Sequence, residues 1–336
     1  MVSGNLSKLR IFTWHIHGSY LYYLSHCPCN FYIPKDSNNK DGYIGKTSNF
    51  PWREKVHEIL KTEVKTQDFD IILFQSKKNY LKDQYDILSP HQRMLPKIFL
   101  EHDPPQKHPT NTKHVVDDPN VVIVHVTDFN NLMWDNNLSP TVVIKHGVKI
   151  PTNVRYNGHL QKGVVVINNI VKRGRRLGLD IFEKVRKQIP LDIVGMNSEL
   201  VGGLGEVPFI KLPQFISHYR FFFNPIRYTS LGLSVLEAMA AGMPVVGLAT
   251  TEVPLVLENN VTGFTHTNTD FLIEKMYQLL NNPTLARKLS GNAKRFANTH
   301  YNIVKFTQNW LNLFTSITKK TSRTVRPLSN SLAVSV

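Results

Sequence analysis

The stretch that decides the fold is residues 219–248, which read YRFFFNPIRYTSLGLSVLEAMAAGMPVVGL. It begins with an apolar run typical of a buried strand and passes through a polar loop. A helical pattern follows over residues 233–241, and Gly242 is placed where a helix commonly ends. Residues 245–248 then form a second apolar run. A strand, a helix and a strand in this order predict a βαβ unit and therefore a parallel sheet.

Short apolar runs alternate with helical patterns along the rest of the chain. Buried strands are expected at 9–15, 70–75, 97–101, 121–126 and 141–145 in the first half, and at 163–168, 191–194, 209–212, 219–224, 245–248 and 263–265 in the second. Polar loops are expected at 33–51, 102–114 and 128–140, and helices at 179–188, 213–219, 233–241, 255–258, 270–281 and 284–300. The alternation predicts an α/β fold whose site lies beyond the carboxyl ends of the strands.

The chain is strongly basic. Its 336 residues carry a formal net charge of +15. This balance suits nucleic acid, phosphorylated small molecules or an anionic membrane surface, and charge alone does not choose among them. Cys27 and Cys29 are the only cysteines and are too close for an ordinary disulfide, and a metal site with His26 lacks a second ligand cluster. With no apolar run of spanning length, we expect a cytoplasmic protein.

Gly232 marks the point where the chemistry is expected. It removes a side chain where the loop turns into the helix, so a ligand can approach the main chain. The helix that begins at Leu233 directs free N–H groups and its positive end to the same place, which suits a diphosphate. Glu237 follows about one turn later and could accept hydrogen bonds from a ribose. Ordinary helix packing explains the same spacing, so the pattern alone leaves both interpretations open.

Three segments together resemble a known family. Residues 231–246 are similar to the donor-binding signature of family 4 glycosyltransferases of the bacterial type. Residues 261–264 stand where that family has its next turn, and residues 143–148 resemble the segment that ends its first domain. Members of this family are retaining enzymes of the GT-B fold, so the resemblance implies two Rossmann-like domains that face each other across a cleft.

The resemblance also implies a domain plan. It places an acceptor-binding domain at 1–150, a nucleotide-sugar donor domain at 151–300 and a helix at 301–318 that crosses back to the first domain. Phe306, Trp310, Leu311 and Phe314 form an apolar stripe that suits such a helix. Residues 319–336 are basic and rich in Ser and Thr, and they are expected to be disordered.

The chain departs from the family pattern at two places. The family has two glutamates separated by seven residues; the second is Glu237, but Thr229 stands at the position of the first. The family often has paired glycines at the positions of Thr251 and Glu252, and these residues are expected either to line the sugar pocket or to form a polar loop. Thr229 carries no charge, so a protein that binds a nucleotide sugar without turning it over is an alternative.

The resemblance suggests the remaining site residues. Arg173 and Arg176, in a basic loop after the first strand of the donor domain, are expected to bind the diphosphate. Gly18 follows the opening strand in a turn that also contains His17. His102 and Asp103 follow a later strand and are the first choice for a histidine that contacts the donor sugar or the acceptor hydroxyl. His125 is the rival, but its place inside a strand predicts a packed side chain.

The sequence therefore predicts a glycosyltransferase that moves a sugar from a nucleoside-diphosphate sugar to an acceptor hydroxyl with retention. The expected catalytic residues are His102, Asp103 and Thr229, and the expected donor-binding residues are Gly18, Arg173, Arg176, Ser230, Gly232, Leu233, Glu237 and Thr251. No metal and no cofactor are expected. The acceptor, either a glycan, a glycolipid or a small molecule, and peripheral attachment to the inner face of a membrane stay open. A basic nucleic-acid-binding protein is the remaining alternative.

Overall fold

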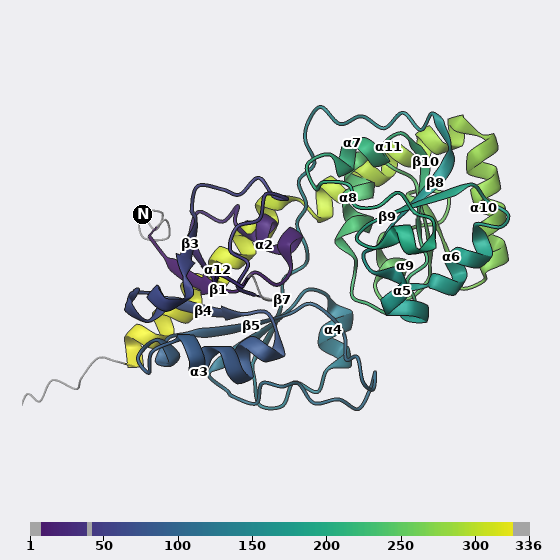
Figure 1. The fold of residues 1–336 in the computed structure, drawn as a ribbon. Helices are drawn as coiled ribbons and strands as arrows, with labels where there is room; N and C mark the ends of the chain where they lie inside the picture. The colour runs from purple at the N-terminus through teal and green to yellow at the C-terminus, as the bar shows by residue number, and fades with distance from the viewer. Residues whose placement is uncertain (1–7, 39–41, 325–336) are drawn as a thin grey trace, which may run out of the picture.

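The computed structural model describes residues 8–38 and 42–324. The first sheet has seven strands in the order β3-β2-β1-β4-β5-β6-β7, and the second has five in the order β12-β11-β10-β8-β9 (Figure 1). The first sheet comprises β1 Arg10–Thr13, β2 Asn30–Lys35, β3 Val56–Leu60, β4 Ile71–Phe74, β5 Lys97–Glu101, β6 Val121–His125 and β7 Thr141–Val143. The second comprises β8 Leu160–Val166, β9 Leu191–Val194, β10 Tyr219–Asn224, β11 Val245–Leu248 and β12 Gly263–His266. All strand pairs within both sheets are parallel, which is the architecture expected of two Rossmann-like domains.

Helices cover both sheets and connect their strands. They are α2 Gly18–Leu24, α3 Gln84–Ile87, α4 Asp128–Met133, α5 Ile170–Arg173, α6 Leu179–Val185, α7 Leu212–Ile216, α8 Leu233–Ala241, α9 Val253–Val256, α10 Thr269–Asn281, α11 Pro283–His300 and α12 Ile303–Thr324. Short turns of other helical types are η1 Lys61–Thr66, η2 Asn79–Asp83, η3 Gln92–Met94, η4 Gly174–Leu177 and η5 Ser198–Val201.

Strand β10 shows why the opening stretch of sequence decides the fold. All six of its residues are buried, and successive side chains point to opposite faces of the sheet. Phe222 belongs to the core cluster shared with α8, whereas Phe221 and Phe223 belong to the cluster under α6 and α10. A strand that is apolar on both faces needs a layer of helices on each, so its sequence requires a central position in the sheet.

Local signals also set the helix ends. Gly242 ends α8 with a φ of 92°, a left-handed conformation that costs a glycine little. The side chains of Asn268 and Asn282 accept hydrogen bonds from the first turns of α10 and α11, and Pro283 occupies the first position of α11. These caps explain why the predicted bounds of the C-terminal helices are close to the observed ones.

The structure corrects several expectations about secondary structure. The segment 33–51 was expected as a loop, but its first residues belong to β2, and neither β2 nor β3 was predicted. The segment 128–140 was also expected as a loop, but its first residues form α4. The polar residues His57 and Glu58 occur in β3 because this strand lies at the edge of the sheet, where it is only half buried. The strand expected at 209–212 is a turn that leads into α7, and Phe209 packs instead against Phe50 and Tyr22 of the first domain.

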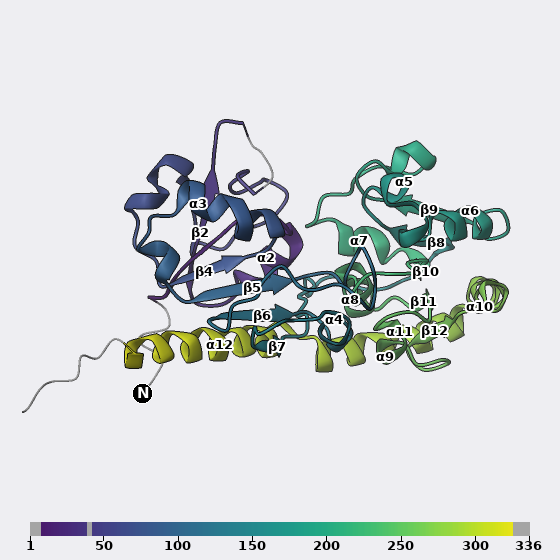
Figure 2. The ribbon, with the colours of Figure 1, turned by 90° about the horizontal axis from the view of Figure 1, so that it is seen from below.

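The last helix returns to the first domain, as expected for a GT-B fold. Figure 2 shows α11 and α12 following one another along one side of both domains, with α12 beneath the first sheet. The Trp310 indole donates a hydrogen bond to the Tyr20 hydroxyl at 3.2 Å, and Phe306 and Phe314 are buried beside it. The helix continues to Thr324, so the disorder expected from residue 319 is wrong as far as that residue. The rest of that predicted tail, 325–336, lies outside the described residues.

Candidate functional site

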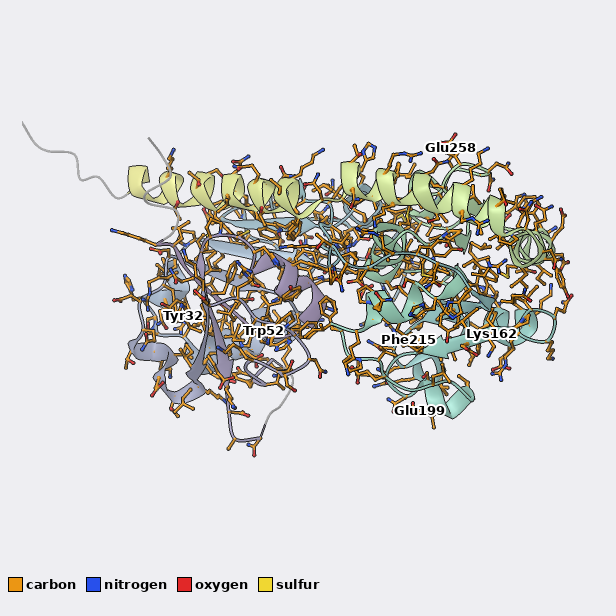
Figure 3. All side chains as sticks on the ribbon, turned by 90° about the horizontal axis from the view of Figure 1, so that it is seen from above. Tyr32, Trp52, Lys162, Glu199, Phe215 and Glu258 are labelled. Carbon is orange, nitrogen blue, oxygen red and sulfur yellow. The ribbon has the colours of Figure 1, made fainter. Side chains whose placement is uncertain are left out.

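A cavity of about 580 Å³ lies between the two domains. Its wall is built from residues that follow the carboxyl ends of strands in both sheets, which is where parallel α/β folds bind ligands. The first domain contributes His15, His17, Gly18, His102, Asp103 and His146 among others, and the second contributes Asn168, Arg173, Gly195, Thr229, Ser230, Gly232, Leu233 and Glu237. Trp52, whose ring lies 5.2 Å from that of His15, is on the side of the first domain that faces the second (Figure 3).

The amino end of α8 opens into this cavity at Gly232. Gly232 has an ordinary extended conformation, with φ −64° and ψ 131°, so it is not glycine because of backbone strain. A Cβ placed there would meet only the Ser234 hydroxyl, at 3.6 Å, so the space beside the residue is open. The first turn of α8 has no side-chain cap. The Val235 N–H donates to the Gly232 carbonyl at 3.1 Å, and the N–H groups of Leu233 and Ser234 precede it at the open end, where an anion can approach.

Glu237 lies inside α8, on the wall of the cavity and at the contact between the domains. Its side chain is buried, with 7% of the residue exposed, and one carboxylate oxygen accepts a hydrogen bond of 2.9 Å from the Tyr23 hydroxyl of α2. Burial raises the pKa of Glu237 to about 7, against a smaller lowering effect of the Tyr23 hydrogen bond. One oxygen of the carboxylate is thus held by the first domain, and the second is the one left for a ligand.

The basic loop contributes one arginine to the cavity. Arg173 lines it, whereas the Arg176 guanidinium contacts Gln106 outside it. Arg175 pairs with Asp180 at 2.6 Å, but Arg173 forms no ion pair with any described residue. Burial and the charge of Arg176 lower the pKa of Arg173, and the charge of Asp103 raises it. Arg173 is therefore a half-buried cation without an ion-pair partner among the described residues, an arrangement that can bind an anion.

Asp103 and Thr229 face each other from the two domains. The Thr229 hydroxyl donates a hydrogen bond of 3.1 Å to Asp103 Oδ1. The Trp134 indole donates to the Asp103 carbonyl at 2.9 Å and fixes the loop that carries the carboxylate. The second domain thus has no acid at residue 229, but the first domain places one against it.

The protonation of His102 follows from its neighbour Gln75. The Gln75 amide nitrogen donates to the Trp14 carbonyl at 2.8 Å and to the Thr13 hydroxyl at 3.0 Å, so its oxygen must accept from His102 Nε2, 3.2 Å away. The hydrogen of His102 is therefore on Nε2, and Nδ1 is an acceptor. Burial is the main cause of a lowered pKa for both His102 and His17, whose rings are 3.9 Å apart, so both are neutral at pH 7.

Two residues expected near the sugar have other partners. Thr251 has a φ of 50°, and its hydroxyl donates to the Ser230 carbonyl at 3.2 Å. The Glu252 carboxylate accepts from the Phe129 amide at 2.7 Å, so it caps the amino end of α4 from the opposite domain. Neither side chain lines the cavity. The sugar-pocket alternative for these positions is therefore corrected to a structural role for both residues.

Other sequence predictions are settled by packing. His125 is buried in β6 and bonds to Asn136 at 2.8 Å, which confirms the expectation that it is packed. Cys27 and Cys29 are buried free thiols. Within 8–38 and 42–324, no group of three His, Cys, Asp or Glu residues is arranged to hold a metal ion. In the same residues, no helix combines the length and apolar character needed to span a bilayer.

Several residues of the site were missed from the sequence. Tyr23 and Gln75 act through hydrogen bonds to Glu237 and His102, which connect residues far apart in the chain. Phe50 and Phe209 meet across the mouth of the cavity with ring centroids 5.0 Å apart. His146 also lines the cavity, and it lies in the segment 143–148 that resembles the end of the family's first domain, so it could have been found.

Comparisons with known proteins bear on the family of the second domain and on the fold. Residues 161–282 match the family described as "Glycosyl transferases group 1". An 86-residue stretch, 26% of this chain, is 29% identical to trehalose synthase of Pyrococcus horikoshii. The match spans 21% of the length of that relative.

Solved structures resemble nearly the whole chain. A sucrose-phosphate synthase from Thermosynechococcus elongatus superposes with a TM-score of 0.68 at 14% identity, over 93% of this chain and 100% of that one. HepE from Anabaena, solved in complex with UDP-glucose, gives a TM-score of 0.67 at 13% identity, over 92% and 100% of the two chains. At such identities the likeness shows the fold. The chain has the GT-B fold, and its second domain carries a glycosyl transferases group 1 match over residues 161–282.

Proposed function

We propose that the protein transfers a sugar from a nucleoside-diphosphate sugar to an acceptor hydroxyl, with retention of the anomeric configuration. One observation carries this proposal: an uncapped helix end, an open glycine and an arginine that pairs with no carboxylate of the described residues meet at one wall of the interdomain cavity. These are the amino end of α8, Gly232 and Arg173. Together they form a site for a diphosphate. HepE, a protein of the same fold, was solved in complex with UDP-glucose, so UDP is the first nucleotide to test.

The proposed diphosphate site also supplies the interaction that stabilises the leaving group. When the bond between the anomeric carbon and the diphosphate breaks, negative charge develops on the leaving group. The N–H groups of α8 and the Arg173 guanidinium are already directed there, so they stabilise that charge without reorganisation. We propose that this replaces the metal ion that other transferases use. Glu237, held on one oxygen by Tyr23, binds the ribose with the other.

The first domain binds the acceptor in this proposal. His17, His102 and Asp103 line the cavity opposite the diphosphate site. Because both imidazoles are neutral, His17 can donate one hydrogen bond and accept another. His102, whose Nε2–H donates to Gln75, can accept one from a hydroxyl at Nδ1. The acceptor oxygen bonds to the anomeric carbon as the diphosphate leaves, and the nucleoside diphosphate is the second product. The hydrogen bond between Thr229 and Asp103 favours an enzyme over a binding protein, because it returns a carboxylate to the position where the family has a glutamate.

The test is binding and turnover of the donor. We expect UDP, GDP or ADP, with its sugar conjugate, to raise the unfolding temperature, and Arg173→Ala to weaken the effective nucleotide by about 10- to 100-fold, the value of a charged hydrogen bond. Lys172→Ala is the matched control, because Lys172 is exposed in the same loop and does not line the cavity. Binding without sugar release would support the binding-protein alternative. No nucleotide binding together with salt-dependent RNA binding would support the nucleic-acid alternative.

A further inference from the structure

The chain carries only basic charges after Glu274. Its last 62 residues, 275–336, contain ten Lys and Arg residues and no Asp or Glu, so they account for +10 of the formal net charge of +15. A surface that only has to stay in water usually mixes both signs of charge. A long segment with one sign therefore points to a partner of the opposite charge.

Helix α11 gathers four of these cations on one face. Arg287 and Lys288 are followed after seven residues, about two helical turns, by Lys294 and Arg295, so all four side chains project in similar directions. Arg287, Lys288 and Arg295 are exposed, and Lys294 is half-buried. The buried residues of α11 lie on its other face, and the helix packs against α8. The four cations therefore point away from the core of the second domain.

Helix α12 extends this surface along the first domain. Figures 2 and 3 show α11 and α12 end to end along one side of both domains. The two helices have 18 and 22 residues, which together span about 60 Å. Lys305 is exposed near the start of α12, and it is followed by exposed neutral residues: Gln308, Asn309, Asn312 and Ser316. Because neither helix contains an acidic residue, their outer surface carries only positive and neutral side chains.

The protein itself does not neutralise these charges. Five cations, which we call the basic face, form no ion pair with any residue of 8–38 or 42–324: Arg287, Lys288, Lys294, Arg295 and Lys305. Burial and the charge of Arg155 lower the pKa of Lys294, so a further cation lies close to this face. Glu258 is an exposed acid beside α11 (Figure 3), but it pairs with none of the five.

We propose that the basic face docks the protein on a membrane surface that contains anionic lipids. Cations spread along about 60 Å of helix match an extended plane of negative headgroups, and each Lys or Arg near such a plane adds to the attraction. Among the residues of α11 and α12 whose side chains are described, Val304 is the exposed large hydrophobic one. The contact is therefore electrostatic, at the headgroups, and does not depend on insertion of an apolar helix face.

A nucleic acid fits the same charge less well. Proteins that bind single strands stack the bases on accessible aromatic rings. The aromatic residues along the two helices are half-buried or buried: Phe296, Tyr301, Phe306, Trp310 and Phe314. The basic face thus offers charge to phosphate groups but no exposed ring to a base.

Docking through the basic face leaves the proposed donor site free. None of its five side chains lines the interdomain cavity. A protein bound to a membrane in this way can still take a nucleotide from solution. The inference therefore goes beyond the proposed function and does not depend on it.

The experiment is sedimentation of the full chain with lipid vesicles. Vesicles of phosphatidylcholine alone are compared with vesicles of phosphatidylcholine and phosphatidylglycerol, at low salt and at high salt. We expect binding to the anionic vesicles, none to the neutral ones, and loss of binding at about 1 M salt, where the screening length is only about 3 Å.

Pairs of charge-removing substitutions locate the surface. Lys294→Gln with Arg295→Gln is expected to weaken binding to the anionic vesicles roughly 25-fold, since each cation near such a surface contributes about fivefold. The matched control is Lys77→Gln with Lys82→Gln, which removes the same charge from exposed residues at η2, where the chain leads into α3 on the opposite face of the first sheet (Figure 2). It should weaken binding much less, because screening limits the attraction to about 10 Å.

A second pair and a nucleotide titration separate binding from folding. Arg287→Gln with Lys288→Gln changes two exposed residues two turns away on the same helix face, and it should weaken vesicle binding to a similar degree. Both α11 pairs should unfold at the temperature of the wild type and keep its affinity for nucleotide. If one pair is less stable, the other pair decides.

Each outcome supports or overturns the inference. No vesicle binding, or equal binding to neutral and anionic vesicles, would overturn it, as would an equal loss in the α11 pairs and the Lys77 and Lys82 control. RNA and duplex DNA at equal phosphate concentration should not displace the protein from the vesicles; displacement that the α11 substitutions abolish would assign the basic face to nucleic acid. If the wild type binds vesicles but no nucleotide, the proposed function fails and this inference stands.

Discussion

The hydroxyl of Thr229 and the carboxylate of Asp103 meet across the two domains at 3.1 Å. The two residues are 126 positions apart in the chain, and each comes from a loop after a strand of a different sheet. The pair joins the two domains and places a carboxylate in the interdomain cavity. The charge of Asp103 also acts against the lowering of the pKa of His17 and of Arg173 by burial.

Asp103→Asn is therefore expected to slow donor turnover more than it weakens donor binding. When the bond to the diphosphate breaks, positive charge develops on the sugar, and the Asp103 carboxylate can stabilise it. The value of kcat should therefore fall by about 100-fold, as when one stabilising group of an active site is removed. The measurement is the rate of nucleoside diphosphate release at saturating donor. Thr229→Ser should keep the rate, because it keeps the hydroxyl.

Asp128→Asn is the control for that experiment. Asp128 is in the first domain as well, but it is exposed and pairs with Lys145 at 2.9 Å. If Asp103→Asn and Asp128→Asn have the same small effect, the carboxylate at residue 103 has no part in the reaction.

Gly232→Ala separates binding from stability at the end of α8. The glycine has an ordinary φ and open space around its missing Cβ, so alanine fits the fold. The free energy of unfolding should stay the same or rise by about 0.4–1 kcal/mol, because alanine restricts the unfolded chain. The methyl group occupies the space through which a phosphate would approach, and the affinity for nucleotide should fall. Urea unfolding and calorimetry on the same preparation provide both numbers, and unchanged nucleotide affinity would show that the diphosphate binds elsewhere.

Much of the second domain could be predicted from the sequence because its signals are local. The apolar run of β10, the glycine at residue 242 and the asparagine caps of α10 and α11 each specify their own element. The first domain was harder, since β3 is a half-buried edge strand whose His57 and Glu58 hide the apolar alternation.

The candidate site also contains residues that the sequence placed correctly and residues that it did not. Gly232, Arg173 and Asp103 were placed by their position after strands, and the structure brings all three to the cavity. Arg176, Thr251 and Glu252 follow strands or turns just as closely, but their side chains turn to Gln106, Ser230 and Phe129. Which way a loop side chain turns depends on partners distant in the chain, two of them here in the other domain, and sequence spacing carries no information about them.

Glu237 is expected to make stability depend on pH. Its pKa is raised from an ordinary 4.5 to about 7, so the folded protein binds a proton that the unfolded chain has lost in this interval. Stability due to this group is therefore full below pH 4.5 and falls as the pH rises to about 7, by an amount on the order of 3 kcal/mol. Unfolding in urea between pH 5 and 8 measures the slope. Glu237→Gln should flatten it, and a slope that survives this change would assign the dependence to another group.

Tyr23→Phe tests the same group from the opposite domain. The Tyr23 hydrogen bond lowers the pKa of Glu237, so its loss should move the pH dependence upward. A ribose needs the carboxylate as an acceptor, and donor affinity should then rise with pH over a correspondingly higher range than in the wild type. Calorimetric titrations of the donor at several pH values give the midpoint. A midpoint that stays where it was would mean that the Tyr23 hydroxyl does not set the ionisation of Glu237.

Trp310→Ala tests whether the last helix holds the first domain. The Trp310 side chain is fully buried and its indole bonds to Tyr20, which in turn packs against both His102 and His146. Its removal should cost about 3–5 kcal/mol, the usual loss for a large aromatic core residue. Val304→Ala, on the same helix but 73% exposed, should change stability by less than about 0.5 kcal/mol. Because Tyr20 loses its anchor, the improvement in affinity from UDP to UDP-sugar should also fall in Trp310→Ala at a temperature where the protein is still folded. A variant that is destabilised but keeps this improvement would show that α12 supports the fold without positioning the histidines.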